Sequence, residues 1–148
     1  MKRFILMTML VAGSLISCDA DDNQNVETPS VVLNTFQSKF PDAQDIEWEK
    51  DQENFEVEFE IDQIEHTALI NREGNLLKRK NEIEISDLPE VVLQNLQANY
   101  EVDKIDDIET LYLEQSIFYQ IEIENTFSSK KIIFNQGGEI AQGIEYME

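Results

Sequence analysis

The sequence has few of the residues that build disulfide frameworks, nucleophilic sites and nucleic-acid interfaces. It contains one cysteine, one histidine and five glycines, and 31 Asp and Glu residues outnumber 11 Lys and Arg residues. One cysteine cannot close a disulfide within the chain, and no glycine-rich phosphate loop is present. The formal net charge of −20 repels a phosphate backbone, which excludes nucleic acid as a partner.

The first 17 residues have the composition of a bacterial export signal. Two basic residues precede an apolar run over residues 4–12, which is too short to span a hydrocarbon core of about 30 Å. Residues 15–18, Leu-Ile-Ser-Cys, resemble the bacterial lipobox, in which the cysteine thiol carries a diacylglyceryl group. We therefore predict a signal peptide over residues 1–17 and a lipid anchor on Cys18. An ordinary signal peptide followed by an unmodified cysteine is the alternative.

The mature chain would have 148 − 17 = 131 residues, the size of one domain, and a net charge of 9 − 31 = −22, because the leader holds two basic residues and no acid. Residues 18–28 are acidic and almost free of apolar side chains, so we expect a flexible tether. The lipid is the only membrane contact expected, because anionic lipid repels so acidic a chain. We place the anchor in the outer membrane, on its periplasmic face or at the cell surface. Asp19 after Cys18 also resembles an inner-membrane retention signal, so the membrane and the face stay open.

The rest of the chain repeats one pattern twice, over about residues 29–85 and 86–148. Apolar residues recur every four positions in the first part of each copy, which predicts an amphipathic helix in each. The matching residues are Val32, Phe36 and Phe40 in the first copy, and Val92, Leu96 and Tyr100 at an offset of 60.

Strands are predicted after each helix. Apolar residues alternate with glutamates over residues 55–61, and residues 119–125 follow the same period of two, which is typical of half-buried strands. Residues 71–74 and 135–138 each have the pattern Asn-x-x-Gly and predict hairpin loops with a left-handed glycine. Further strands are expected at about 66–70, 76–85, 130–134 and 139–146.

These elements predict an α+β fold of two tandem repeats, each with a helix followed by about four antiparallel strands. Both helices must cover the apolar face of the sheet, because their own apolar stripes need a partner. The other face is then expected to be open to water and acidic.

With the repeat established, the chain resembles the PepSY-like lipoproteins, which are described as beta-lactamase-inhibitor-like. The resemblance is carried by the leader with Cys18, helices at about 29–40 and 88–100, the strand start at residues 46–49, and the two Asn-x-x-Gly hairpins. It implies an exported α+β protein with a curved sheet whose open face grips another protein. Secreted inhibitors of that shape are braced by disulfides and this chain is not, so inhibition of a beta-lactamase is not inferred.

Neither catalysis nor a cofactor is predicted. His66, the single histidine, aligns with Lys130 at the start of a strand, where we expect a solvated side chain instead of a base beside a nucleophile. Glu56, Glu58 and Glu60 point the same way at intervals of about 6.8 Å, twice the strand rise. One strand cannot supply the six to eight oxygens that calcium needs, so no metal site is predicted.

The open face is the remaining candidate for function, as a docking surface for an envelope protein or a cationic peptide. A solvated face without a partner is the alternative interpretation, and a sensory or regulatory domain acting on an envelope peptidase or membrane signalling system is the alternative function. Tyr112 and Phe118 are candidate aromatic anchors, although they could instead pack on each other across a hairpin. The predicted partner-binding residues are Glu47, Glu49, Glu56, Glu58, Glu60, Tyr112, Phe118, Glu122 and Glu124, with Glu82, Glu84, Lys78 and Lys80 on the same face.

Overall fold

The computed structural model describes residues 26–125 and 128–148. The predicted signal peptide, Cys18 and most of the predicted tether lie outside the described residues. Val26, inside the predicted tether, is partly buried against the core under the first helix. In the described part of the chain, neither helix is both long enough and apolar enough to cross a bilayer.

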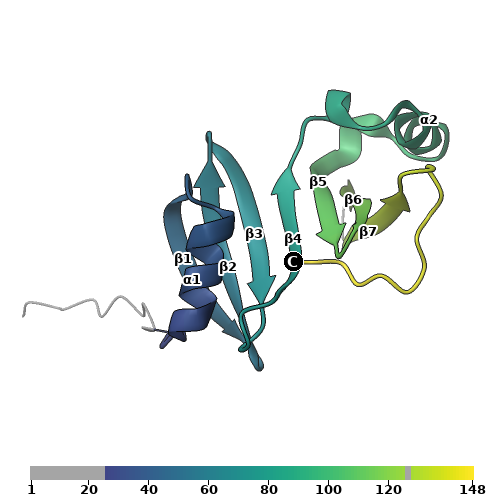
Figure 1. The fold of residues 1–148 in the computed structure, drawn as a ribbon. Helices are drawn as coiled ribbons and strands as arrows, with labels where there is room; N and C mark the ends of the chain where they lie inside the picture. Colours follow the sequence, from purple (N-terminus) through teal and green to yellow (C-terminus); the bar gives the residue numbers. More distant parts are fainter. Residues whose placement is uncertain (1–25, 126–127) are drawn as a thin grey trace, which may run out of the picture.

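The fold is one seven-stranded antiparallel sheet with a helix before each half of it (Figure 1). The strands follow one another in chain order from β1 to β7, so every strand pairs with its sequence neighbours. The elements are α1 (Ser30–Lys39), β1 (Gln44–Asp51), β2 (Asn54–Ile61), β3 (Ile64–Ile70), β4 (Leu76–Glu82), α2 (Glu90–Asn99), β5 (Ile105–Leu113), β6 (Ser116–Asn125) and β7 (Ser128–Asn135), with short 3-10 helices at Ile85–Asp87 and Val102–Lys104.

Each helix buries its apolar stripe against the strands of its own repeat. Val32 and Phe36 of α1 lie in one core cluster with apolar residues of β2 and β3, and Val92 and Leu96 of α2 lie in a second cluster with residues of β5, β6 and β7. All four side chains are buried, and each such burial contributes about 1.5–3 kcal/mol. The predicted α+β fold with two tandem helix-plus-sheet repeats is therefore confirmed.

The two repeats also share the contact between hairpin and helix. Gly74 and Gly138 have φ values of +84° and +80°, as predicted for the last residue of each Asn-x-x-Gly loop. Thr35 Oγ1 donates to the Gly74 carbonyl oxygen at 2.8 Å, and Asn95 Nδ2 donates to the Gly138 carbonyl oxygen at 2.7 Å. Thr35 and Asn95 are separated by the same offset of 60 as the core residues, so the pseudo-symmetry extends to polar contacts.

The strand predicted at 139–146 is wrong, so the second repeat has three strands where the first has four. Only Ile140 forms an isolated bridge, with Phe134 of β7. Gly143 then adopts a φ of +76°, a left-handed conformation that interrupts an extended strand. Beyond Gly143 the chain returns across the sheet and ends beside β4 (Figure 1).

The strand predicted at 76–85 also ends early, at Glu82. Glu84 caps the following 3-10 turn, where its main-chain N–H donates to Asp87 Oδ2 at 3.3 Å. Glu84 was expected on the open face of the sheet, and the structure removes it from that face because the strand has already ended.

Candidate functional site

The candidate site is the sheet face opposite the helices, called here the open face. On β2 the side chains of Phe55, Val57 and Phe59 are buried under α1, so the alternating glutamates point to the other side. Strand pairing puts the predicted Glu47 and Glu49 beside them, together with Glu65, which was not predicted. The pairs are Glu47 with Glu58 and Glu49 with Glu56, and Glu60 with Glu65 on β3.

The β1–β5 part of the open face is hollowed, and seven of its eleven lining residues are acidic. The hollow has a volume of about 320 Å³. A β-bulge between Gln44 and Glu47, with Asp45 at a φ of 47°, locally twists β1 where it borders the hollow. The charged residues that line the hollow, called here the acidic hollow, are Asp45, Glu47, Glu58, Glu60, Glu65, Lys80, Glu82 and Glu109.

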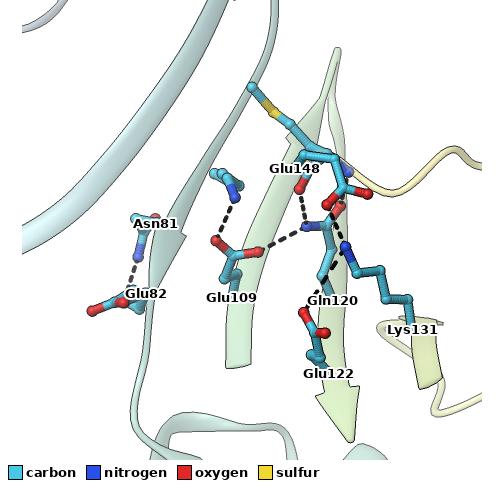
Figure 2. Close-up of polar contacts among 9 residues, drawn as sticks. Asn81, Glu82, Glu109, Gln120, Glu122, Lys131 and Glu148 are labelled. Atoms are coloured by element: carbon cyan, nitrogen blue, oxygen red, sulfur yellow. Dashed lines mark hydrogen bonds and ion pairs between the residues drawn. The ribbon is translucent and has the colours of Figure 1, made fainter. Parts of the chain in front are cut away.

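Lys80 is already engaged by one of these acids. Its Nζ lies 2.8 Å from Glu109 Oε1, and the two side chains are only 13% and 6% exposed. The second carboxylate oxygen of Glu109 accepts from Gln120 Nε2 at 2.9 Å (Figure 2). The single lysine of the lining is therefore held against one carboxylate, which leaves the other six lining acids for an incoming cation.

Crowding and burial make several carboxylates of this face harder to ionise. Burial raises the pKa of Glu109 even though Lys80 and Gln120 both oppose the shift. Burial also raises the pKa of Glu56, with Asp51 and Glu58 adding to the shift. The charged form of each group is disfavoured in the folded chain, and a cation bound nearby would relieve that cost.

Two further carboxyls beside the end of β4 follow the same trend. Burial raises the pKa of Glu82, and the neighbouring charges of Glu65 and Asp107 raise it further. Burial likewise raises the pKa of Asp107.

The β5–β7 part of the open face is covered by residues 142–148, called here the C-terminal segment. Met147 is 1% exposed and packs with Leu69 and Leu111, whose side chains belong to the open face. Lys131 of β7 pairs with the Glu148 carboxylate (Figure 2). The prediction of a bare acidic face is therefore correct for the first repeat and wrong for much of the second.

The two predicted aromatic anchors lie on opposite faces of the sheet. Phe118 is opposite Leu111 in the β5–β6 register and packs against the cluster that contains Met147. Tyr112 is on the helix side, where the Arg79 guanidinium lies 3.7 Å from its ring centroid. They therefore do not pack on each other.

The remaining predicted site residues are Glu122 and Glu124 on β6. Glu122 is half-buried and lies 3.9 Å from Lys131, so it is part of the charge cluster around the C-terminal segment. Glu124 is exposed and pairs with Ser129, far along the strand from the acidic hollow.

His66 differs from the expected solvated strand end. It lies opposite Phe59 on the helix side, and the two rings stack at a centroid distance of 5.3 Å. Burial and the Arg79 charge lower its pKa, which favours the neutral ring. Among the described residues, no group of three His, Cys, Asp or Glu side chains is arranged to hold a metal ion.

Sequence reasoning missed four residues that matter for this face: Glu65, Glu109, Gln120 and Met147. The sequence does hold a signal for Glu109. On β5 it alternates in step with Leu111 and Leu113 and so lies on the same face as they do, and Lys80 and Glu82 share a face of β4 in the same way. The pairing of Glu109 with Lys80 depends on the register between β4 and β5, and these strands are separated by α2. No local sequence pattern predicts the register between β4 and β5.

Two solved structures from Bacteroides show the same fold. One, described as "putative periplasmic proteins" from Bacteroides eggerthii, has a TM-score of 0.73 at 14% identity, over 78% of this chain and 86% of that chain. The other, a BLIP-like protein from Bacteroides fragilis, has a TM-score of 0.68 at 22% identity, over 82% of this chain and 89% of that chain. No curated protein matches the sequence.

A family model matches the sequence twice, once in each repeat. The family is described as "Putative beta-lactamase-inhibitor-like, PepSY-like", and the matched residues are 16–78 and 71–142. Together these matches cover more than half of the chain, and each contains one α-helix and strands that follow it. The chain therefore belongs to the PepSY-like, beta-lactamase-inhibitor-like family.

Proposed function

We propose that this protein is a lipid-anchored, non-catalytic binding module of the cell envelope, and that its acidic hollow docks a cationic segment of a partner protein. The observation that carries the proposal is the lining of the hollow, with seven acids and one lysine. That lysine, Lys80, is held by Glu109 at 2.8 Å. An arriving Lys or Arg side chain would therefore meet carboxylates without displacing a cation.

Electrostatics favour a basic partner over a neutral or acidic one. Like charges gathered in a hollow focus the field, which raises the encounter rate of an oppositely charged partner and rejects partners of the same sign. Burial raises the pKa of Glu82, and the charges of Glu65 and Glu109 in the same hollow add to the shift, so a bound cation would also relieve repulsion among these groups. Binding should therefore weaken as salt concentration rises.

The envelope location and the anchor have separate support. The leader over residues 1–17 and the lipobox-like residues 15–18 support export and lipidation at Cys18. The fold relative from Bacteroides eggerthii carries a periplasmic description, which agrees with export. The Bacteroides fragilis relative is called BLIP-like; we do not extend that name to inhibition of a beta-lactamase by this chain.

The direct test is a matched pair of charge-reversal variants. The first replaces Glu58, Glu60 and Glu65 in the hollow with lysine. The control replaces Asp42, Glu53 and Glu73 with lysine. These residues are exposed and lie outside the hollow, so the control changes the net charge by the same amount.

We expect the hollow variant to lose at least ten-fold affinity for an Arg- and Lys-rich peptide in isothermal titration calorimetry, while the control loses less than about three-fold. The same hollow variant should no longer retain a basic partner from envelope extract. Equal losses in both variants would mean that net charge alone attracts the peptide, and the hollow would have no docking role.

A further inference from the structure

The C-terminal segment lies on the open face without forming a strand. Among the described residues, two hydrogen bonds join the main chain of residues 142–148 to the sheet, and both are made by Met147. Its N–H donates to Gln120 Oε1 at 2.8 Å, and its carbonyl oxygen accepts from Gln120 Nε2 at 3.0 Å. The segment is thus held at one residue, while its chain from Gln142 to Tyr146 crosses the face by side-chain contact.

The surface beneath the segment has the parts of a peptide-binding slot. Gln120 is 0% exposed, and its amide engages the N–H and the carbonyl of a single residue, as the edge of a strand would. Leu69 and Leu111 form an apolar site that receives the Met147 side chain. Lys131 then pairs with the next residue, Glu148. The slot therefore binds an extended main chain in which a long apolar side chain is followed by a carboxylate.

The attachment before Met147 is suited to release. Gly143 has a φ of +76° and no heavy atom within 4 Å of the position that a Cβ would take, so the chain is not packed against other residues on that side of Gly143. Glu145 is exposed. Removing the segment would expose the apolar side chains of Leu69 and Leu111 to water, and exposing apolar surface costs free energy. Release is therefore favourable only when another segment fills the slot.

We propose that the β5–β7 half of the open face is a second docking site, for an extended peptide segment of a partner in which an unbranched apolar side chain precedes an acidic one. The C-terminal segment is the internal ligand that fills this slot until the partner's segment replaces it. This site adjoins the acidic hollow at Glu109, which Gln120 contacts, and it differs from the hollow in the charge of the side chain that it takes, because Lys131 pairs with a carboxylate. It does not depend on the hollow binding a cation.

The test uses the full chain and a labelled peptide with the sequence of residues 141–148. Met147→Asp places a charge in the Leu69 and Leu111 site, which disfavours the internal segment and vacates the slot. We expect this variant to bind the peptide at least ten-fold more tightly than the unmodified chain does, in fluorescence anisotropy. Adding Gln120→Leu should abolish the gain, and a peptide carrying Asp in place of its methionine should not bind.

Hydrogen exchange on the unmodified chain provides a readout that does not depend on the variant's folding. The Met147 amide should exchange by local opening at least ten-fold faster than the Ile121 amide of β6, if the segment detaches while the sheet stays intact. The proposal is overturned if Met147 exchanges only as fast as the sheet core. It is also overturned if Met147→Asp keeps the native near-ultraviolet circular dichroism spectrum but gains no affinity for the peptide.

Discussion

The two halves of the open face belong to one sheet and to equivalent repeats, yet they differ in what covers them. The first half is bare and carries the acidic hollow, whereas the second is closed by Met147 and its neighbours. On the helix side the repeats agree down to the bonds from Thr35 and Asn95 to the two hairpin glycines. The helix side therefore builds the domain, and the open face is where the two copies differ in chemistry and, we propose, in function.

The buried ion pair at the boundary between the two halves should give the largest effect on stability. Lys80→Met leaves the Glu109 carboxylate, in a side chain 6% exposed, without its cation, and removing one partner of a buried pair costs about 3–5 kcal/mol. Urea unfolding at pH 7 measures this change in the free energy of unfolding.

The matched control is Lys78→Met, which changes a half-buried lysine of the same strand face and should cost less than about 1 kcal/mol. The double variant Lys80→Met with Glu109→Met should recover most of the loss, because neither side chain then buries an unpaired charge. If Lys80→Met and Lys78→Met cost the same, the pair does not join the two halves as described.

The hairpin glycines allow the two repeats to be compared directly. At Gly138 an added Cβ would lie 2.7 Å from the main-chain oxygen of Val91, and at Gly74 it would lie 2.8 Å from a methyl carbon of Val31. Both substitutions also place alanine in the left-handed region, at about 1–3 kcal/mol.

A side-chain methyl can move aside more easily than a helix carbonyl, so Gly138→Ala should destabilise the chain more than Gly74→Ala. Thermal melting of the two single variants measures the order. The reverse order would show that the second helix yields more readily than the first.

The pH dependence of stability should be the smallest of these effects, and it runs against the usual behaviour of carboxylates. Burial raises the pKa values of Glu56, Glu82, Asp107 and Glu109 in the folded chain. Each group therefore binds its proton more tightly when folded, so its contribution to stability is full below the unfolded pKa and is lost as pH rises through the folded pKa.

We expect the free energy of unfolding to increase as pH falls from 7 toward about 4.5, the range above the unfolded pKa of glutamate. Glu56→Gln with Glu82→Gln should flatten this slope, and Glu53→Gln with Glu73→Gln, in exposed turns, should flatten it less. A steady loss of stability over the same range would contradict the account of crowded carboxylates.

The helix side of the fold could be predicted from the sequence because its signals are local and occur twice. The four-residue spacing of Val32, Phe36 and Phe40 and the alternation over residues 55–61 each require one face to be buried. His66 was misplaced despite a usable signal, since it shares strand parity with Ala68 and Ile70, both of which are buried. The alignment of His66 with Lys130 was weaker evidence for its orientation than this alternation.

The open face could be predicted only in its first half, because there each glutamate is set by its own strand. In the second half the decisive contacts join residues far apart in the sequence, such as Gln120 and Met147. The hairpin loop predicted at residues 135–138 suggested one more strand after it, over residues 139–146. Instead of forming a strand, this part of the chain places Met147 against Leu69 and Leu111. These two residues come from strands of different repeats, so no local sequence pattern predicts that they meet.

The most direct test of the central claim is site-specific photocrosslinking in living cells, with the photoreactive residue at position 65 in the acidic hollow. The control carries it at position 37, in place of the exposed Gln37 on the outer side of α1. We expect a discrete crosslinked product from position 65 alone, joined to a partner segment rich in Lys and Arg, as identified by mass spectrometry. Identical products from both positions, or a product from position 65 that maps to a neutral or acidic segment, would contradict this expectation.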